Sequence, residues 1–311
     1  MLKNTLRWIG SSIGYLLYGA AVLALLLWLL FPKEAARRFL EASLQRVYPQ
    51  MTWHVGAVQL AFPGVATAQA IEGREPGDAL KVLARMDTLA LRPNIVGSFA
   101  NRSVQIDFRM AAGKGSVAGN ARIMGQQRGV RVVGTIDGIK LADFPVFSQR
   151  LGRTLQGVVA GTFATTVVPD REELTDLEAR LNAENGLLGL KRPLFGHAEL
   201  PFSQGAVVLR VQGGRLVLEQ GRLESELCSG EFSGMLKMER NPALGRLDVQ
   251  GKLHPKAAFF KGMDSTLALQ AFRVQLKDNS LPFRISGTLS DPGIHYEDFS
   301  MLVQNLEQEL K

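Results

Sequence analysis

The sequence predicts a mainly β protein attached to a membrane by one N-terminal helix. Three observations carry this prediction: an uncharged stretch of 25 residues near the N-terminus, a series of segments in which apolar and polar residues alternate, and turn residues between those segments. Such strands form a sheet with one apolar face, which has to be covered. Because predicted helices are few, we expect a sandwich, a closed barrel or a strongly curved half-pipe.

The uncharged stretch runs from Trp8 to Pro32 and is typical of a membrane anchor. A helix of this length crosses a hydrocarbon layer of roughly 30 Å. A cleavable signal peptide has a shorter apolar core and a small-x-small site after it, which is absent here. We therefore assign residues 1–32 to a short stub and a transmembrane anchor. Gly10 and Gly14 form a GxxxG pair, which lets two anchors pack into a homo-oligomer, although such residues also simply fit in lipid.

Charge and cysteine content exclude some classes of function. The 311 residues carry a formal net charge of +7, and Lys3 and Arg7 contribute two of these charges ahead of the anchor. Basic blocks are too short and aromatic residues too few for nucleic-acid binding, so no nucleic acid is expected as a partner. Basic residues flank the anchor on both sides, which leaves its orientation open. The single cysteine, Cys228, excludes an internal disulfide.

Residues 33–50 are predicted to form a juxtamembrane helix, which Pro49 ends. Its apolar residues recur at helical spacing, with the arginines mostly elsewhere. Two interpretations remain open: the arginines contact lipid phosphates, or the helix caps the core of the body. The residues on the apolar face are Ala36, Leu40, Leu44 and Val47.

Residues 51–311 are predicted to form a β-rich body. The alternation that favours strands with one apolar face covers 103–110, 232–238, 246–253, 272–277 and 283–289. If the sheet is a half-pipe, its inner face becomes a groove in which an acyl chain can lie. The same residues are also explained as ordinary core. The candidate groove-lining residues are Val104, Ile106, Phe108, Phe232, Leu236, Leu247 and Val249.

The remaining elements are predicted from local patterns. Leu141–Leu151 and Pro255–Met263 are expected to be short helices, and Asp298–Leu310 a longer one. Glu172–Glu184 fits both periods, and the turn residues after it favour a strand. Gly113–Gly119 resembles a phosphate-binding loop, but a strand pattern follows it instead of a helix, which favours a hairpin turn.

The sequence contains no recognisable catalytic site. The four histidines, His54, His197, His254 and His295, lack a second ligand at metal spacing. HExxH, CxxC and P-loop motifs are absent from the sequence. Cys228 has no histidine nearby, which favours a small hydrophobic residue over a nucleophile. We therefore expect no catalytic, cofactor-binding or metal-binding residues.

Several segments resemble a known family of envelope proteins. An N-terminal anchor, the W-x-V of Trp53–Val55, the AFPG of Ala61–Gly64 and one-faced strands punctuated by glycine resemble AsmA-like proteins of Gram-negative envelopes. Gly213–Pro255 and Arg284–Pro292 are similar to the type II secretion system protein N family, GspN. The resemblance implies a cytoplasmic N-terminus, an inner-membrane anchor and a periplasmic AsmA-like β-groove. It also implies no enzyme activity and no cofactor.

Two functions of different classes follow as expectations. The first is an accessory or structural component of the type II secretion system, anchored in the inner membrane, with other secretion components as partners. The alternative is an AsmA-like module that binds or transfers lipid, with inner-membrane lipids and their acyl chains as partners. A membrane-tethered enzyme is disfavoured because the sequence contains no recognisable catalytic constellation.

Overall fold

A computed structural model describes most of the body and little of the N-terminal segment. The described residues are 18–19, 22, 31–61, 64–124, 129–168, 176–194, 197–212, 214–239, 244–260, 276 and 279–296. The anchor expected at Trp8–Pro32, with Gly10 and Gly14, lies almost wholly outside them, as do most of the strand at 272–277 and the helix at Asp298–Leu310. Within the described ranges, no helix has both the length and the apolar character needed to span a membrane.

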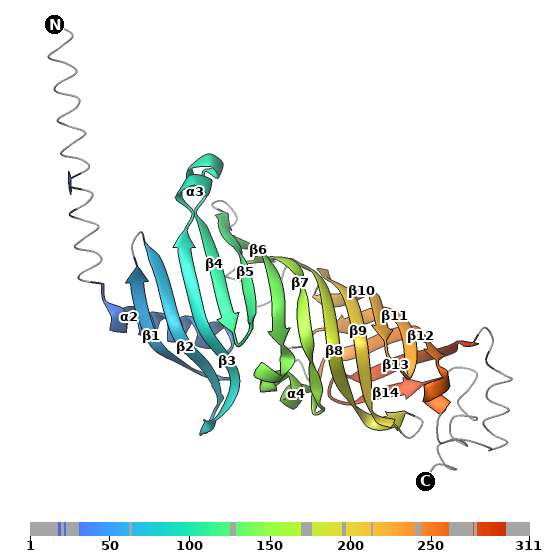
Figure 1. Cartoon of the computed structure of the whole chain (residues 1–311). Helices are drawn as coiled ribbons and strands as arrows, with labels where there is room; N and C mark the ends of the chain where they lie inside the picture. The colour runs from blue at the N-terminus through green and yellow to red at the C-terminus, as the bar shows by residue number, and fades with distance from the viewer. Residues whose placement is uncertain are drawn as a thin grey trace, which may run out of the picture.

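The described residues form one open antiparallel sheet of 14 strands, in which every strand pairs with its neighbours in chain order (Figure 1). A mainly β fold is therefore confirmed. The strands are β1 (Thr52–Ala61), β2 (Val65–Glu75), β3 (Asp78–Pro93), β4 (Gln105–Ala112), β5 (Gly115–Met124), β6 (Gly129–Lys140), β7 (Leu155–Val167), β8 (Asp176–Leu194), β9 (His197–Gln212), β10 (Arg215–Glu224), β11 (Cys228–Lys237), β12 (Arg246–Pro255), β13 (Leu281–Thr288) and β14 (Pro292–His295).

Most element predictions that fall within the described ranges agree with the structure. Gly113–Gly119 forms the turn between β4 and β5 and the start of β5, and the ambiguous segment around 176–184 belongs to strand β8. Leu141–Leu151 contains the 3₁₀ turn η1 (Leu141–Asp143) and helix α4 (Pro145–Leu151). The helix expected from Pro255 is wrong at its start, because β12 continues to Pro255 and the described residues after it form the 3₁₀ turn η3 (Ala257–Phe260).

Helix α2 (Lys33–Val47) covers the β1 end of the sheet. Its apolar residues Ala36, Leu40 and Leu44, with Phe31 before it, pack against a buried cluster of the first two strands. Val47, which the periodicity also placed on this face, is 82% exposed. The apolar face of α2 therefore caps the core of the body, as the second interpretation of this helix predicts. The buried cluster consists of Val55, Val58, Ala68 and Ile71.

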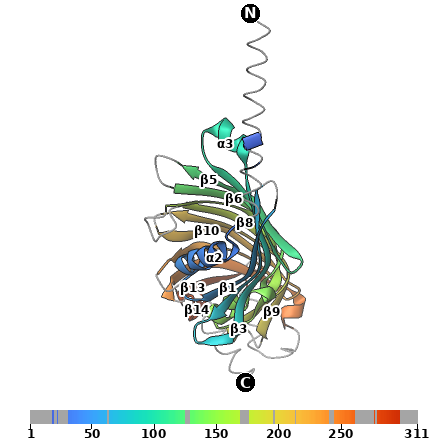
Figure 2. The same cartoon turned by 90° about the vertical axis from the view of Figure 1, so that its left-hand side faces the viewer.

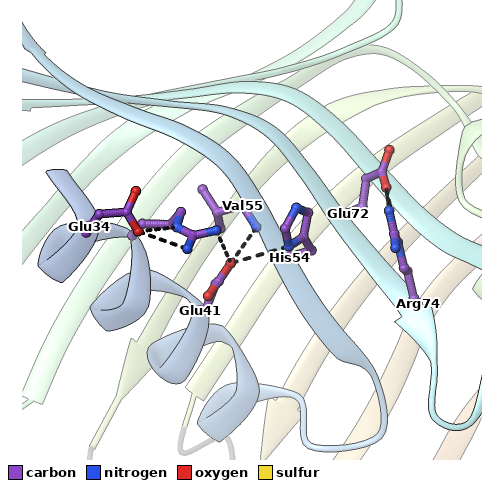
Figure 3. Close-up of polar contacts among 7 residues, drawn as sticks. Glu34, Glu41, His54, Val55, Glu72 and Arg74 are labelled. Carbon is purple, nitrogen blue, oxygen red and sulfur yellow. Dashed lines mark hydrogen bonds and ion pairs between the residues drawn. The ribbon is translucent and has the colours of Figure 1, made fainter. Parts of the chain in front are cut away.

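A polar contact fixes α2 to the edge strand β1 (Figure 3). Glu41 Oε1 accepts a hydrogen bond from the backbone N–H of Val55 at 2.9 Å and lies 3.6 Å from His54 Nδ1. Arg37 approaches the same oxygen at 4.0 Å and pairs with Glu34 at 2.9 Å. The unpaired edge of a sheet can pair with strands of other molecules. The carboxylate of Glu41 accepts a hydrogen bond from the N–H of Val55 on this edge strand, which helps to protect the edge.

The opposite end of the sheet has its own core. Phe259 and Phe260 of η3 pack with Leu281 and Tyr296. The rings of Phe259 and Phe260 meet edge to face, with their centroids 5.3 Å apart. Phe259 is 1% exposed and Leu281 is fully buried. The sheet is therefore covered at both ends of the strand row, by α2 near β1 and by η3 near β14. Figure 2, which looks along the row from the β1 end, shows the strands arching around the space where α2 lies.

Two non-glycine residues with positive φ keep the apolar face continuous. Ala70 in β2 and Asn185 in β8 each have φ of 50°. Such a residue reverses the alternation of side chains along its strand. As a result Ile71 joins the same buried cluster as Ala68, and Leu188 beyond Asn185 packs into the core at the β14 end.

Candidate functional site

The register of the sheet assembles one apolar row that contains a residue from every strand. Paired residues of an antiparallel ladder point to the same face, so a row can be followed from partner to partner. We call this set the central row. Its members are Leu60, Ala66, Leu91, Phe108, Gly119, Gly134, Phe163, Ala179, Leu209, Leu218, Gly234, Val249, Ile285 and Ile294.

The central row is long and largely uncovered. Fourteen strands at about 4.8 Å spacing give a row of about 60 Å. All of its members are half-buried or buried. Between β4 and β12, however, none of them belongs to a core cluster of the described residues. The face is therefore apolar over its whole length, and from β4 to β12 no member of the central row is packed into one of the cores formed by the described residues.

Two flanking rows widen this apolar face from β4 to β13. One passes through Ile106, Leu236 and Leu247, and the other through Phe232 and its partners. In their full length the flanking rows contain one polar residue, Thr165. The first is Ile106, Ala121, Val132, Thr165, Leu177, Val211, Leu216, Leu236, Leu247 and Gly287; the second is Met110, Val117, Ile136, Gly161, Leu181, Val207, Gly221, Phe232, Gly251 and Phe283.

Six of the seven predicted groove residues lie on this one face. Phe108 and Val249 belong to the central row, and the other four belong to the flanking rows. Val104 is the exception, because it precedes β4 and is 56% exposed. Its carbonyl accepts a hydrogen bond from Ile123 N at 2.9 Å, so its backbone continues the pairing while its side chain stands in solvent.

A repeated phenylalanine–glycine pairing fills the face. In each pair a phenylalanine ring lies over the glycine directly opposite it on the neighbouring strand, where a β-carbon would collide with the ring. Aromatic side chains placed this way cover the gap that a glycine leaves in a sheet. The alternation visible in the sequence does not reveal these pairs. They are Phe108–Gly119, Phe163–Gly134, Phe202–Gly186, Phe232–Gly221 and Phe283–Gly251.

Replacing Gly134 by alanine is expected to destabilise the sheet by about 1–3 kcal/mol, the usual range for overpacking. The new β-carbon would lie 2.7 Å from Phe163 Cζ and 2.9 Å from the carbonyl oxygen of Ala118. Gly205→Ala is the matched control, because its nearest neighbour, Phe202, is 3.7 Å away. Thermal unfolding of the two variants checks this, and equal melting temperatures would contradict the Phe163 contact.

The opposite face of the sheet is polar. Arg210 pairs with Glu178 and with Glu219, each at 3.1 Å. The guanidinium of Arg284 contacts both carboxylate oxygens of Asp248, at 2.9 and 3.1 Å. This hydrogen bonding lowers the pKa of Asp248. Exposed pairs of this kind contribute little to stability, typically about 0–1 kcal/mol each, so they mark the solvated side of the sheet.

A pocket among the described residues also lies on the polar side. It has a volume of about 650 Å³ and is lined by residues of β8 to β12, including Glu184, Arg222 and Glu231. Its charges are largely paired: Arg222 Nε lies 3.4 Å from Glu231, and Lys256 contacts Glu224. Across the described part of the chain, histidine, cysteine and carboxylate side chains form no group of three suited to a metal ion.

Cys228 is part of the core at the β14 end. Its side chain is fully buried, and burial raises the pKa of its thiol to about 11. A thiol is nucleophilic only as the thiolate, so this cysteine is inert at neutral pH. The structure therefore supports the interpretation of Cys228 as a small hydrophobic residue.

We expect Cys228 to resist maleimide labelling in the folded protein at pH 7 to 8 and to react fully after denaturation. The pKa of the Cys228 thiol is higher in the folded protein than its ordinary value of 9.0, so the native state holds the proton more tightly than the unfolded state does. The contribution of Cys228 to stability should thus fall as the pH rises from 9 towards 11 and be absent in Cys228→Ala. Rapid labelling of the folded protein would contradict its burial.

Comparisons of the chain with protein-family models, with curated proteins and with solved structures found no match.

Proposed function

We propose that the protein holds acyl chains of membrane lipids along the apolar face of its sheet. In this proposal the sheet is a β-groove of the AsmA-like type, and residues 1–32 anchor it in the inner membrane with the N-terminus cytoplasmic and the body periplasmic. The role is one of binding or transfer, without catalysis. The observation that carries it is the central row, in which all 14 strands contribute an apolar residue.

The physical support is that the apolar face is large and that few of the described residues cover it. Removing apolar surface from water contributes about 25 cal/mol per Å², so a face of this size has a strong tendency to be covered. Monomeric soluble proteins rarely leave larger apolar patches open unless a partner or lipid binds there. An acyl chain fits the requirement, because it presents apolar groups without hydrogen-bonding demands along its length. A row of about 60 Å also exceeds the roughly 15 Å depth of one leaflet, so several chains fit end to end.

Mass spectrometry of lipid that co-purifies with the full chain tests this proposal. The protein is extracted in mild detergent, washed, and compared with an anchored control protein of similar size. We expect at least one mole of phospholipid per mole of protein above the control. Lipid content equal to that of the control, with the sheet shown to be folded by circular dichroism, would overturn the proposal.

A second candidate function is an accessory role in type II secretion. Its support is the similarity of Gly213–Pro255 to the GspN family, a segment that spans strands β10 to β12 of the sheet. In this role the apolar face would contact another secretion component. Deletion of the gene is expected to lower the secretion of folded exoproteins, with complementation as the control. Unchanged secretion would exclude this role and leave lipid binding unaffected.

A further inference from the structure

An exposed apolar tip projects from the sheet between β3 and β4. Helix α3 (Ile95–Asn101) stands beyond the ends of the neighbouring strands (Figure 1). We call residues 94–104 the α3 tip. Its large apolar side chains face solvent: Ile95 is 63% exposed, Val96 81%, Phe99 82% and Val104 56%. Exposed apolar side chains that cluster in this way mark an interaction surface.

The backbone of the α3 tip is held firmly by polar groups at its base. Asn94 Oδ1 caps the helix by accepting a hydrogen bond from Gly97 N at 2.7 Å. The amide nitrogen of Asn94 donates to Asp107 Oδ2 at 3.1 Å, and Asn120 donates to the other oxygen of Asp107 at 2.7 Å. These contacts fix the start of α3 to β4 and β5.

A second set of bonds closes the C-terminal side of the tip. Ser98 Oγ donates to Asn94 O at 2.6 Å and accepts from Gln105 N at 2.9 Å. With its amide oxygen turned towards Arg122, Gln105 also accepts from Nε and Nη2 of that guanidinium at 3.0 and 2.9 Å. The polar side chains therefore hold the tip in place while its apolar side chains point outwards. Such an arrangement presents the apolar residues in a fixed position.

The charge around the α3 tip is positive. Between Asp87 and Asp107 the chain contains no acidic residue, whereas it contains Arg92 and Arg102. Both arginines are exposed, and Arg122 lies at the base. Asp107 is occupied by the amides of two asparagines. An apolar tip surrounded by arginines complements a membrane interface, where acyl chains lie below anionic headgroups.

We infer that the α3 tip inserts into the lipid interface of the membrane that carries the anchor. This inference rests on the proposed anchoring by residues 1–32 and goes beyond acyl binding. The tip follows directly from strand β3, so its insertion would give the sheet a second membrane contact besides the anchor. Two contacts fix the direction in which the strand row leaves the membrane. A second copy of the chain and another protein are the rival occupants of the tip.

Depth-dependent fluorescence quenching tests the inference on the full chain. Val96→Cys is labelled with an environment-sensitive dye and incorporated into vesicles of phosphatidylethanolamine and phosphatidylglycerol that contain nitroxide-labelled lipid. Native Cys228 stays in place because it is buried. The matched control is Leu80→Cys, which is 94% exposed near the start of β3. Leu80 lies about 43 Å along the strand from Pro93, the last residue of β3, at 3.3 Å per residue, which is more than a bilayer interface can span.

We expect the extent of quenching at position 96 to be at least about three times that at position 80, because the side chain at position 96 lies in the interface. Adding Arg92→Gln and Arg102→Gln should reduce that quenching, because each arginine near an anionic surface contributes about fivefold to binding. Equal quenching at both sites, or none at position 96 in protein that floats with the vesicles, overturns the inference. A fluorescence change that depends on protein concentration and needs no lipid would assign the tip to a second copy.

The outcomes separate this inference from the proposals on which it rests. Protein that does not float with the vesicles would overturn the anchoring and the inference together. Protein that floats and still carries acyl lipid, but shows no quenching at position 96, would overturn the tip insertion alone.

Discussion

Replacing Leu209 by glutamate is expected to lower the amount of co-purifying lipid by about tenfold or more, because an isolated carboxylate under an acyl chain costs several kcal/mol. Leu209 is a half-buried member of the central row, between Ala179 and Leu218. A charge at this position interrupts the apolar row near its middle. Lipid analysis of the purified full chain measures the effect.

Val208→Glu provides the matched control for this prediction. Val208 is the preceding residue of the same strand, is also half-buried, and faces the polar side opposite Arg180. The same charge added there should leave the lipid content within about twofold of the original protein, since surface substitutions have small effects. Equal loss of lipid in both variants would contradict an apolar binding face, because the face of the sheet would then not matter.

Replacing Phe259 by alanine is expected to destabilise the protein by about 3–5 kcal/mol, the usual cost of removing a buried aromatic ring. Phe259 is 1% exposed and contacts Phe260 edge to face. Its ring also lies 5.9 Å from the ring of His197 in β9. The two rings of η3 belong to the core at the β14 end, so the loss should loosen the last strands first.

Denaturant unfolding of the full chain in mild detergent measures this second effect. Phe39→Ala is the control, because Phe39 lies on the outer side of α2 and is 75% exposed. Its replacement should change the free energy of unfolding by no more than about 0.5 kcal/mol. If both variants unfolded at the same denaturant concentration, the core assigned to η3 would not exist.

Local patterns in the sequence were sufficient to predict much of the fold. The alternation of apolar and polar residues identified β4, β11, β12 and β13, because a strand with one wet face has a period of two. The glycine cluster at 113–119 indicated a hairpin, which the structure confirms. Six of the seven candidate groove residues were assigned to the apolar face for the same reason.

The continuity of that face could not be predicted, because it depends on register between strands. Positive φ at Ala70 and Asn185 reverses the alternation of side chains within β2 and β8. The presence of an alanine or an asparagine in a sequence is not sufficient to predict this conformation. The phenylalanine–glycine pairs join residues of neighbouring strands, which a periodic pattern along one strand does not show. The sequence thus predicts which side of each strand is apolar, but not which residues meet across the sheet.

The α3 tip was missed because its pattern interrupts a strand signal. Val104 continues the period of Ile106 and Phe108, so alternation alone extended the strand to it. In the structure β4 begins at Gln105, and the side chain of Val104 is exposed at the base of the tip. The signal that could have marked the tip is the Pro93–Asn94 pair, which is typical of a turn or a helix start.

Photo-crosslinking from the central row tests the main claim most directly. Benzoylphenylalanine is placed at Phe163 in the central row or at Thr162 on the polar face of the same strand, and the full chain is irradiated in intact membranes. The proposal predicts phospholipid adducts from position 163 and at most about a tenth as many from position 162, because only one face is apolar. Adducts of equal yield from both positions, or none from position 163, would contradict the lipid-binding face.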